Sequence, residues 1–168
     1  MTDDDDKRLV TLFHAFCGQV AAYAARRVPA AMVEDVVSRT FETAWRKVDA
    51  IPESDDQALF WLYGVAWGHV RNGLRTELRG GRLLGRMKGV RQSSAVPDPA
   101  GEVADRVTFE ELMARLPARD REVLRLHYWE ELTVGEVAEV LRCKPNAAAV
   151  RLHRARRRLE EIVRTCDV

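Results

Sequence analysis

The sequence predicts an all-α protein of two small helical domains joined by a flexible linker, the second containing a helix-turn-helix. Apolar residues recur at three- and four-residue steps over most of the chain, which is the period of a helix with one buried face. No segment shows the alternating pattern of a strand. Glycine, serine and proline interrupt the helical period at 80–104, so we expect a linker there between domains at 7–79 and 105–165.

Composition limits the functions that the chain can have. Its 168 residues suffice for two small domains, and a hydrophobic fraction of 46% suffices for a core in each. The formal net charge is only +1, but arginines gather at 71–91 and 142–158, whereas acids gather at 3–6 and 53–56. Because a polyanion responds to local charge, the two basic segments are candidates for binding nucleic acid.

Cysteine and histidine spacing gives no sign of a metal site. The cysteines Cys17, Cys143 and Cys166 are far apart, and no cysteine–histidine cluster has zinc-ligand spacing. We therefore expect a reduced, cytoplasmic protein without metal or cofactor. No apolar run is long enough to span a membrane, and the acidic start is unlike a signal peptide.

The first domain is predicted to begin with two amphipathic helices. The first covers 7–27 and is stopped by Pro29, and the second covers 31–48 with Glu34 and Asp35 in its first turn. The outer face of the second helix is charged and by itself would indicate only a solvated surface. Its inward face is predicted to consist of Val33, Val36, Val37, Phe41, Ala44, Trp45 and Val48.

The third predicted helix, at 57–79, carries a core stripe and a second face that mixes aromatic and basic residues. Such a mixture suits single-stranded nucleic acid, because bases stack on the rings while cations follow the backbone. Core packing is the alternative for Phe60 and Trp61, and the pattern does not decide between the two. The residues of this face are Phe60, Trp61, Trp67, His69, Arg71, Asn72, Arg75 and Arg79.

The second domain is predicted to contain four helices and to end in a helix-turn-helix. Thr133 and Glu136 have the spacing of a capping box at the start of one helix, and Asn146 is a suitable N-cap for the next. In that last helix an apolar stripe runs beside a line of arginines, and its N-terminal residues would meet base edges in the major groove of a duplex. A solvated basic helix is the alternative. The residues expected at the DNA are Asn146, Ala147, Ala149, Val150, Arg151, Arg154 and Arg158.

Motifs in both domains carry a resemblance to one known family. In chain order they are Glu34–Val37, Phe41, Ala44–Arg46, Trp61–Tyr63, Ala66, Leu74–Arg75, Leu116–Pro117, Arg121–Leu126, Leu132–Ala138 and Arg151–Arg156. In this order they resemble bacterial RNA polymerase sigma factors of the extracytoplasmic function (ECF) group, in the sigma-70 family. The chain departs from that pattern at Ser38-Arg39, where the family usually has an acidic or amide pair, and at Trp67-Gly68, where it usually has Arg-Asn.

The resemblance implies a transcription initiation factor with core RNA polymerase and promoter DNA as partners. The first domain would bind the polymerase clamp through Asp35, Arg39, Glu42 and Arg46. It would hold the unpaired strand of the −10 box with the acidic loop at 49–57 and the third helix. The second domain would read the −35 box as duplex and touch the polymerase flap with its apolar side. Many members of the family are held inactive by an anti-sigma factor.

Two other functions compete with this interpretation. A helix-turn-helix regulator with an N-terminal sensory or partner-binding domain would explain 116–163 equally well, but not the aromatic and basic face of the third helix. An enzyme is not expected, because the four histidines, His14, His69, His127 and His153, are predicted on four separate helices, without a nucleophile motif or a phosphate-binding loop.

Overall fold

The computed structural model describes residues 3–85 and 108–166, with side chains over 5–75 and 108–165. The chain divides into two compact units, Met1–Val96 and Pro97–Val168. In the described part, all regular structure is helical and no strand is present, which confirms the predicted all-α class.

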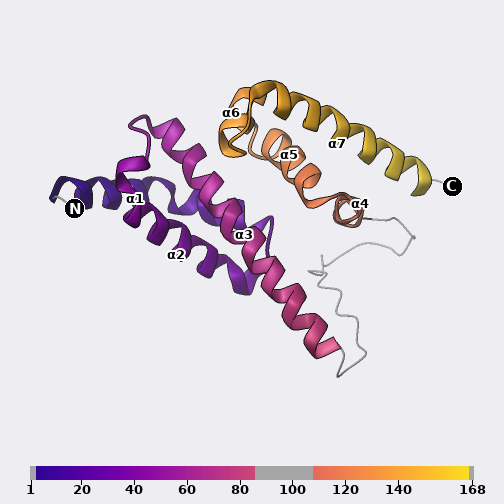
Figure 1. Cartoon of the computed structure of the whole chain (residues 1–168), viewed down its shortest axis with the longest axis horizontal. Coiled ribbons are helices and arrows are strands. Elements are labelled where there is room, and N and C mark those ends of the chain that lie inside the picture. The colour runs from indigo at the N-terminus through magenta and orange to yellow at the C-terminus, as the bar shows by residue number, and fades with distance from the viewer. Residues whose placement is uncertain (1–2, 86–107, 167–168) are drawn as a thin grey trace, which may run out of the picture. The chain divides into compact units, whose positions relative to one another are not determined.

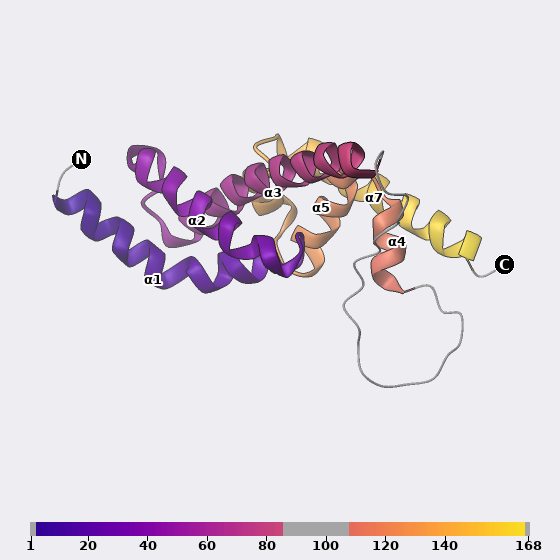
Figure 2. The same ribbon diagram turned by 90° about the horizontal axis from the view of Figure 1, so that it is seen from below.

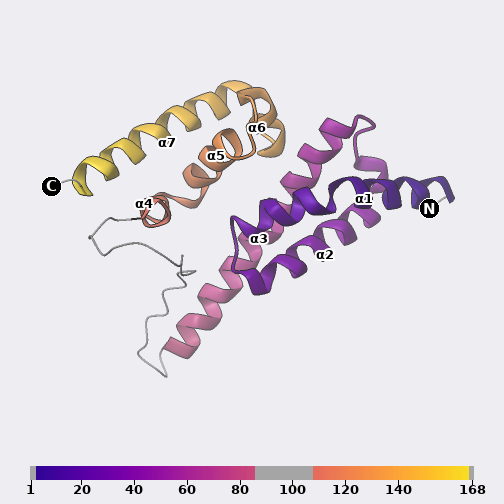
Figure 3. The same ribbon diagram turned by 180° about the vertical axis from the view of Figure 1, so that it is seen from behind.

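The N-terminal unit is a bundle of three long helices (Figure 1). These are α1 (Asp3–Ala25), α2 (Ala30–Arg46) and α3 (Asp55–Gly85), with the short 3-10 helix η1 (Val48–Ala50) between α2 and α3. Every pair of the long helices is in contact, and the rings of Tyr23 and Tyr63 stack at 4.6 Å between centroids. The C-terminal half of α3 continues past α1 and α2, as Figures 1 and 3 show.

The helix boundaries around Pro29 differ from the prediction. α1 begins at Asp3 and ends at Ala25, four residues before the proline that was expected to stop it. Pro29 instead stands immediately before α2, and its carbonyl accepts a hydrogen bond from the Met32 amide at 2.8 Å. Ala30 and Ala31 are strong helix formers, so α2 starts directly after the proline. Glu34 and Asp35 therefore do not lie in its first turn, and that prediction was wrong.

The inward face of α2 was also predicted imperfectly. Val36, Thr40 and Ala44 are its fully buried residues, and they are spaced one turn apart. Thr40 is tolerated in the core because its hydroxyl donates to the Val36 carbonyl at 2.7 Å. Trp45 follows Ala44 by one residue, a third of a turn away from this line, and is 47% exposed. The prediction that Trp45 points inward was wrong.

α3 extends six residues into the segment that was expected to be linker. Gly80, Gly81 and Gly85 all lie within the helix. A glycine costs a helix about 1 kcal/mol relative to alanine, but extending an existing helix needs no new nucleation. The glycines consequently do not end α3 at Arg79. The rest of the expected linker, 86–104, lies outside the described residues.

The C-terminal unit contains α4 (Phe109–Arg115), α5 (Ala118–Tyr128), α6 (Val134–Val140) and the long α7 (Pro145–Cys166) (Figure 1; Figure 2 shows α4, α5 and α7 from below). Helices α4, α5 and α6 each contact α7. Met113, Val123, Leu126 and Val137 are almost completely buried. From α7 the core receives Ala148, Leu152 and Ala155 of the predicted stripe, while Leu159 and Ile162 are half-buried.

Of the two helix caps predicted for the helix-turn-helix of this unit, one is confirmed and the other was wrong. The Thr133 amide donates to Oε2 of Glu136 at 2.7 Å, and the Glu136 amide donates to the Thr133 hydroxyl at 3.4 Å, which confirms the capping box of α6. Asn146 is not the N-cap of α7. The helix begins at Pro145, because proline has a helical φ and lacks only an amide hydrogen that the first turn would leave unpaired.

Candidate nucleic-acid interface

A basic pocket lies along the N-terminal half of α7. It has a volume of about 450 Å³ and is lined by Asp120, Lys144, Asn146, Ala147, Val150, Arg151, Arg154 and Arg158. The structure thus brings together all the residues predicted at duplex DNA except Ala149, which is half-buried outside this lining. Arg151, Arg154 and Arg158 are three and four residues apart and therefore share one face of the helix.

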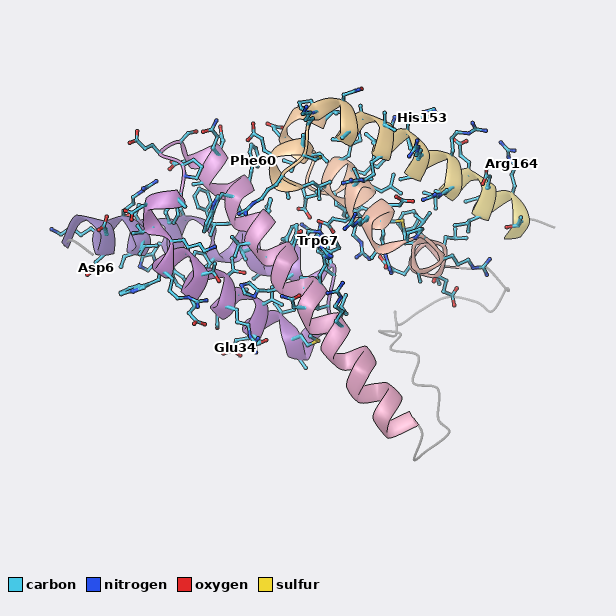
Figure 4. The ribbon with its side chains drawn as sticks, viewed as in Figure 1. Asp6, Glu34, Phe60, Trp67, His153 and Arg164 are labelled. Carbon is cyan, nitrogen blue, oxygen red and sulfur yellow. The ribbon has the colours of Figure 1, made fainter. Side chains whose placement is uncertain are left out.

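Arg158 differs from the other arginines of the basic pocket because it has an acidic partner. Its Nη1 donates to Oδ2 of Asp120 on α5. The Arg158 side chain is 51% exposed, whereas that of Asp120 is only 9% exposed. Arg156 is on a different face, 5.3 Å above the Tyr128 ring, and His153 projects from α7 into solvent (Figure 4).

The aromatic and basic residues predicted on α3 do not all share one face. Trp61, Trp67 and Arg71 are half-buried, and Asn72 and Arg75 are exposed. Figure 4 marks Phe60 and Trp67 on this helix; Phe60 is buried, so it belongs to the core. The Arg79 side chain lies outside the described side chains.

His69 points toward α2 and not toward the Trp67 side of α3, because residues two apart lie on nearly opposite sides of a helix. Its Nε2 lies 3.0 Å from the Thr43 hydroxyl. Burial lowers the pKa of His69, and Arg39 and Arg46 act in the same direction, while Asp35 and Glu42 act against them. His69 is therefore neutral at neutral pH and surrounded by the charges of α2.

Those four charged residues, Asp35, Arg39, Glu42 and Arg46, form a face of α2 that we call the charged face. Arg39 Nε is 2.8 Å from Oδ1 of Asp35, and Arg46 Nη2 is 3.7 Å from Oε1 of Glu42. All four side chains are more than half exposed. Exposed pairs of this kind add little stability, so the face is available to a partner.

The loop between α2 and α3 is attached to α1 by Arg8, which sequence reasoning did not single out. Nη2 of Arg8 donates to the carbonyls of Ile51 and Pro52, at 2.9 and 2.6 Å. The partners are more than forty residues apart, so no local pattern signals this contact. The loop is therefore hydrogen-bonded to α1 at Ile51 and Pro52, shortly before α3 begins at Asp55.

An apolar groove of about 720 Å³ lies in the C-terminal unit. Phe109, Tyr128, Trp129 and Val163 line it and are among the exposed large hydrophobic residues. The centroids of the Phe109 and Trp129 rings are 5.2 Å apart. Arg156, Glu160 and Arg164 are the charged residues of its lining.

Within the described residues, no helix is both long and apolar enough to cross a membrane. In the same part of the chain, no three histidine, cysteine or acidic side chains gather into a group able to hold a metal ion.

Both units match family models. Residues 12–80 match "Sigma-70 region 2", and residues 106–159 match "Sigma-70, region 4". The ECF RNA polymerase sigma factor SigL of Mycobacterium tuberculosis is 30% identical over 134 residues, which cover 77% of this chain and 73% of SigL. The chain belongs to the ECF sigma factors. RNA polymerase sigma factor NccH of Alcaligenes xylosoxydans xylosoxydans is 29% identical over 160 residues, covering 90% of this chain and 84% of NccH.

Solved sigma factors have the same fold. RpoE of Bartonella quintana, in complex with the anti-sigma factor NepR, matches with a TM-score of 0.62 at 24% identity, covering 97% of this chain and 98% of RpoE. CnrH, in complex with the cytosolic domain of CnrY, matches with a TM-score of 0.60 at 24% identity, covering 95% and 90% of the two chains. As an ECF sigma factor, the chain is a transcription initiation factor whose partners are core RNA polymerase and promoter DNA. The family consists of sigma factors, which are not enzymes.

Proposed function

We propose that this sigma factor reads the −35 element with α7, holds the unpaired −10 strand with α3 and binds core polymerase through α2. The observation that carries the proposal is the basic pocket, which gathers arginines and small side chains at the N-terminal half of the second helix of a helix-turn-helix. This is the part of such a motif that enters the major groove.

For the −35 element, the proposed base contacts come from the start of α7. Arginine can bond guanine bidentately, and small apolar side chains can contact the thymine methyl. Lys144 adds a cation beside them. Arg158 is left out of the set because its guanidinium is bonded to Asp120. The proposed residues are Asn146, Ala147, Ala149, Val150, Arg151 and Arg154.

For the −10 element, we propose that bases of the unpaired strand stack on the tryptophans of α3 while its arginines follow the phosphates. Stabilising unpaired bases would assist promoter melting. Arg8 supports this proposal because it fixes the loop that precedes α3. His69 is left out because it is bonded to Thr43. The proposed residues are Trp61, Trp67, Arg71, Asn72, Arg75 and Arg79.

For core polymerase, we propose two contacts. The charged face of α2, formed by Asp35, Arg39, Glu42 and Arg46, would bind the clamp, and its exposure supports this role. The apolar groove would receive a segment of the flap, because its aromatic lining is exposed and can be buried by a partner.

We further propose that the working domains are 7–79 and 105–165, joined by a linker at 80–104 whose first residues are helical. The protein would act in the cytoplasm, where its polymerase is. An anti-sigma factor would hold it inactive, a proposal supported by RpoE and CnrH, which were solved with NepR and with the cytosolic domain of CnrY.

A run-off transcription assay with purified core polymerase and a pool of genomic promoter fragments tests this function. We expect specific transcripts that depend on the protein and that share a −35 and a −10 box. Binding to duplex DNA without association with core polymerase would contradict the proposal and favour a helix-turn-helix regulator. Core binding without transcripts would contradict the promoter contacts alone.

A further inference from the structure

The basic pocket contains an acid that promoter binding does not require. Asp120 lies in the first turn of α5 and lines the pocket, although its side chain is only 9% exposed. Among the described residues of the lining it is the only acid, beside the cations Lys144, Arg151, Arg154 and Arg158. An acid is unfavourable next to a polyanion, so its position calls for a reason.

The geometry of the ion pair indicates which cation Asp120 neutralises. Its Oδ2 accepts a charge-assisted hydrogen bond from Nη1 of Arg158. Moving Arg158 onto a phosphate would leave the nearly buried Asp120 carboxylate without its cation, which is costly. In addition, salt screens this partly buried pair less than it screens an exposed contact with a phosphate. Arg158 would therefore stay with Asp120 when DNA is present.

Arg158 would otherwise extend the DNA-facing line of α7. It follows Arg154 by four residues, one helical turn further along the same face. Each phosphate that a cation neutralises releases counterions and tightens binding to every DNA sequence. An unpaired Arg158 would add one such contact.

We propose that Asp120 limits the sequence-independent affinity of this sigma factor for DNA by neutralising Arg158. The inference rests on the proposed function, since it requires that α7 faces the duplex. With Asp120 in place, binding depends more on the base-reading residues at the start of α7 and less on phosphate contacts that are the same for every sequence. The free factor is also retained less by bulk DNA and stays available to core polymerase.

The test is the salt dependence of binding between the full-length chain and a fluorescent duplex of random sequence, at about 50 to 200 mM salt. Asp120→Asn should steepen the slope of log K against log salt by about 0.9 and tighten binding roughly three- to tenfold at the low-salt end. Removing the whole pair, in Asp120→Asn with Arg158→Gln, should leave the wild-type slope. Glu161→Gln makes the same charge change at an exposed position of α7 outside the pocket and should also leave the wild-type slope.

An unchanged or shallower slope for Asp120→Asn would overturn the inference. So would a double variant whose slope is shallower by about 0.9, because Arg158 would then be a phosphate contact in the wild type. If circular dichroism shows that Asp120→Asn does not fold, Arg158→Gln alone keeps the test decisive: it should leave the wild-type slope, and a slope shallower by about 0.9 would overturn the inference. Failure of the wild type itself to bind duplex DNA would overturn the proposed role of α7 and the inference with it.

Discussion

Nε2 of His69 lies 3.0 Å from the hydroxyl of Thr43, and this contact links α3 to the charged face of α2. The same hydroxyl donates its proton to the Arg39 carbonyl at 2.8 Å. A hydroxyl has only one proton, so the donor between the two side chains is Nε2–H of His69. The neutral ring therefore carries its proton on Nε2, and Nδ1 is the nitrogen that takes up a second proton at low pH.

This arrangement predicts a dependence of stability on pH. Because burial lowers the pKa of His69, the folded chain binds a proton less readily than the unfolded chain, whose histidine has a pKa of about 6.5. Between the two pKa values the unfolded state holds more protons, so the free energy of unfolding increases with pH there. The contribution of neutral His69 should be complete above about pH 6.5 and decrease as the pH falls through the lowered pKa.

Urea unfolding at about pH 7.5 and about pH 5.5, on either side of the unfolded pKa, measures this contribution. His69→Gln keeps a donor for Thr43 but has no titrating group, so it should lose less stability at the lower pH than the wild type. His14→Gln changes an exposed histidine on α1 and should behave as the wild type. If His69→Gln and the wild type lost the same free energy of unfolding at the lower pH, His69 would not be the source of the pH dependence.

Replacing Arg151 and Arg154 together by alanine should abolish transcription that depends on the −35 element, without unfolding the protein. Each lost bidentate base contact costs about 1–3 kcal/mol of discrimination. Run-off transcription from a promoter with and without its −35 box measures the effect. Arg157→Ala removes an exposed arginine of the same helix outside the basic pocket and should leave the response intact. Normal output from a well-folded double variant would rule out α7 as the reader.

Trp67→Ala should weaken binding of the holoenzyme to a fork template with an unpaired −10 strand by about 1–3 kcal/mol, the usual contribution of one stacked base. Trp67→Phe retains a ring and should restore most of the affinity. Binding to a duplex that carries only the −35 box should not change in either variant. A loss that is equal on fork and duplex templates would instead indicate damage to the fold.

Features that depend on neighbours in the chain were predictable from the sequence. Thr133 and Glu136 of the capping box are three positions apart, and the buried stripe of α7 repeats every three or four residues, so both patterns are visible in the sequence. The start of α7 was predicted two residues too late: the helix begins at Pro145, so Lys144 and not Asn146 precedes its first residue.

Features that depend on packing between helices were not predictable. Trp45 and His69 both fit the periodicity of their helices, but the way that α2 contacts its neighbours leaves Trp45 in solvent and turns His69 toward Thr43. The partners of Arg158 and Arg8 lie 38 and more than forty residues away. Many hydrogen-bond acceptors in the sequence could pair with either arginine, and only the tertiary structure shows which of them lies next to it.

Thr133→Ala should lower the free energy of unfolding of the C-terminal unit by about 1 kcal/mol, because the amide of Glu136 loses its acceptor. Since α6 supports α7, −35-dependent transcription should decrease in parallel. Thr133→Ser keeps the hydroxyl and should retain both stability and transcription. Thermal unfolding of the full chain measures the first effect, and an unchanged melting profile for Thr133→Ala would show that the capping box contributes nothing.

Arg8→Met tests whether the loop before α3 must be held in place for −10 binding. Nη2 of Arg8 donates to two carbonyls of that loop, and a charged hydrogen bond contributes about 1.5–3 kcal/mol, so its loss should loosen Ile51 and Pro52. We expect affinity for the unpaired −10 strand to fall roughly tenfold, the equivalent of one such bond, while duplex −35 binding stays unchanged.

Arg8→Lys separates the geometry of the guanidinium from its charge. An ammonium group has the charge but not the planar donor geometry, so Arg8→Lys should recover only part of the −10 affinity. Lys7→Met removes the same charge from an exposed neighbouring residue and should have no effect on the −10 strand. Equal losses for Lys7→Met and Arg8→Met would mean that the positive charge at the start of α1 attracts the strand directly. A loss confined to Arg8 would mean that α1 takes part in promoter melting by fixing the loop, without touching DNA.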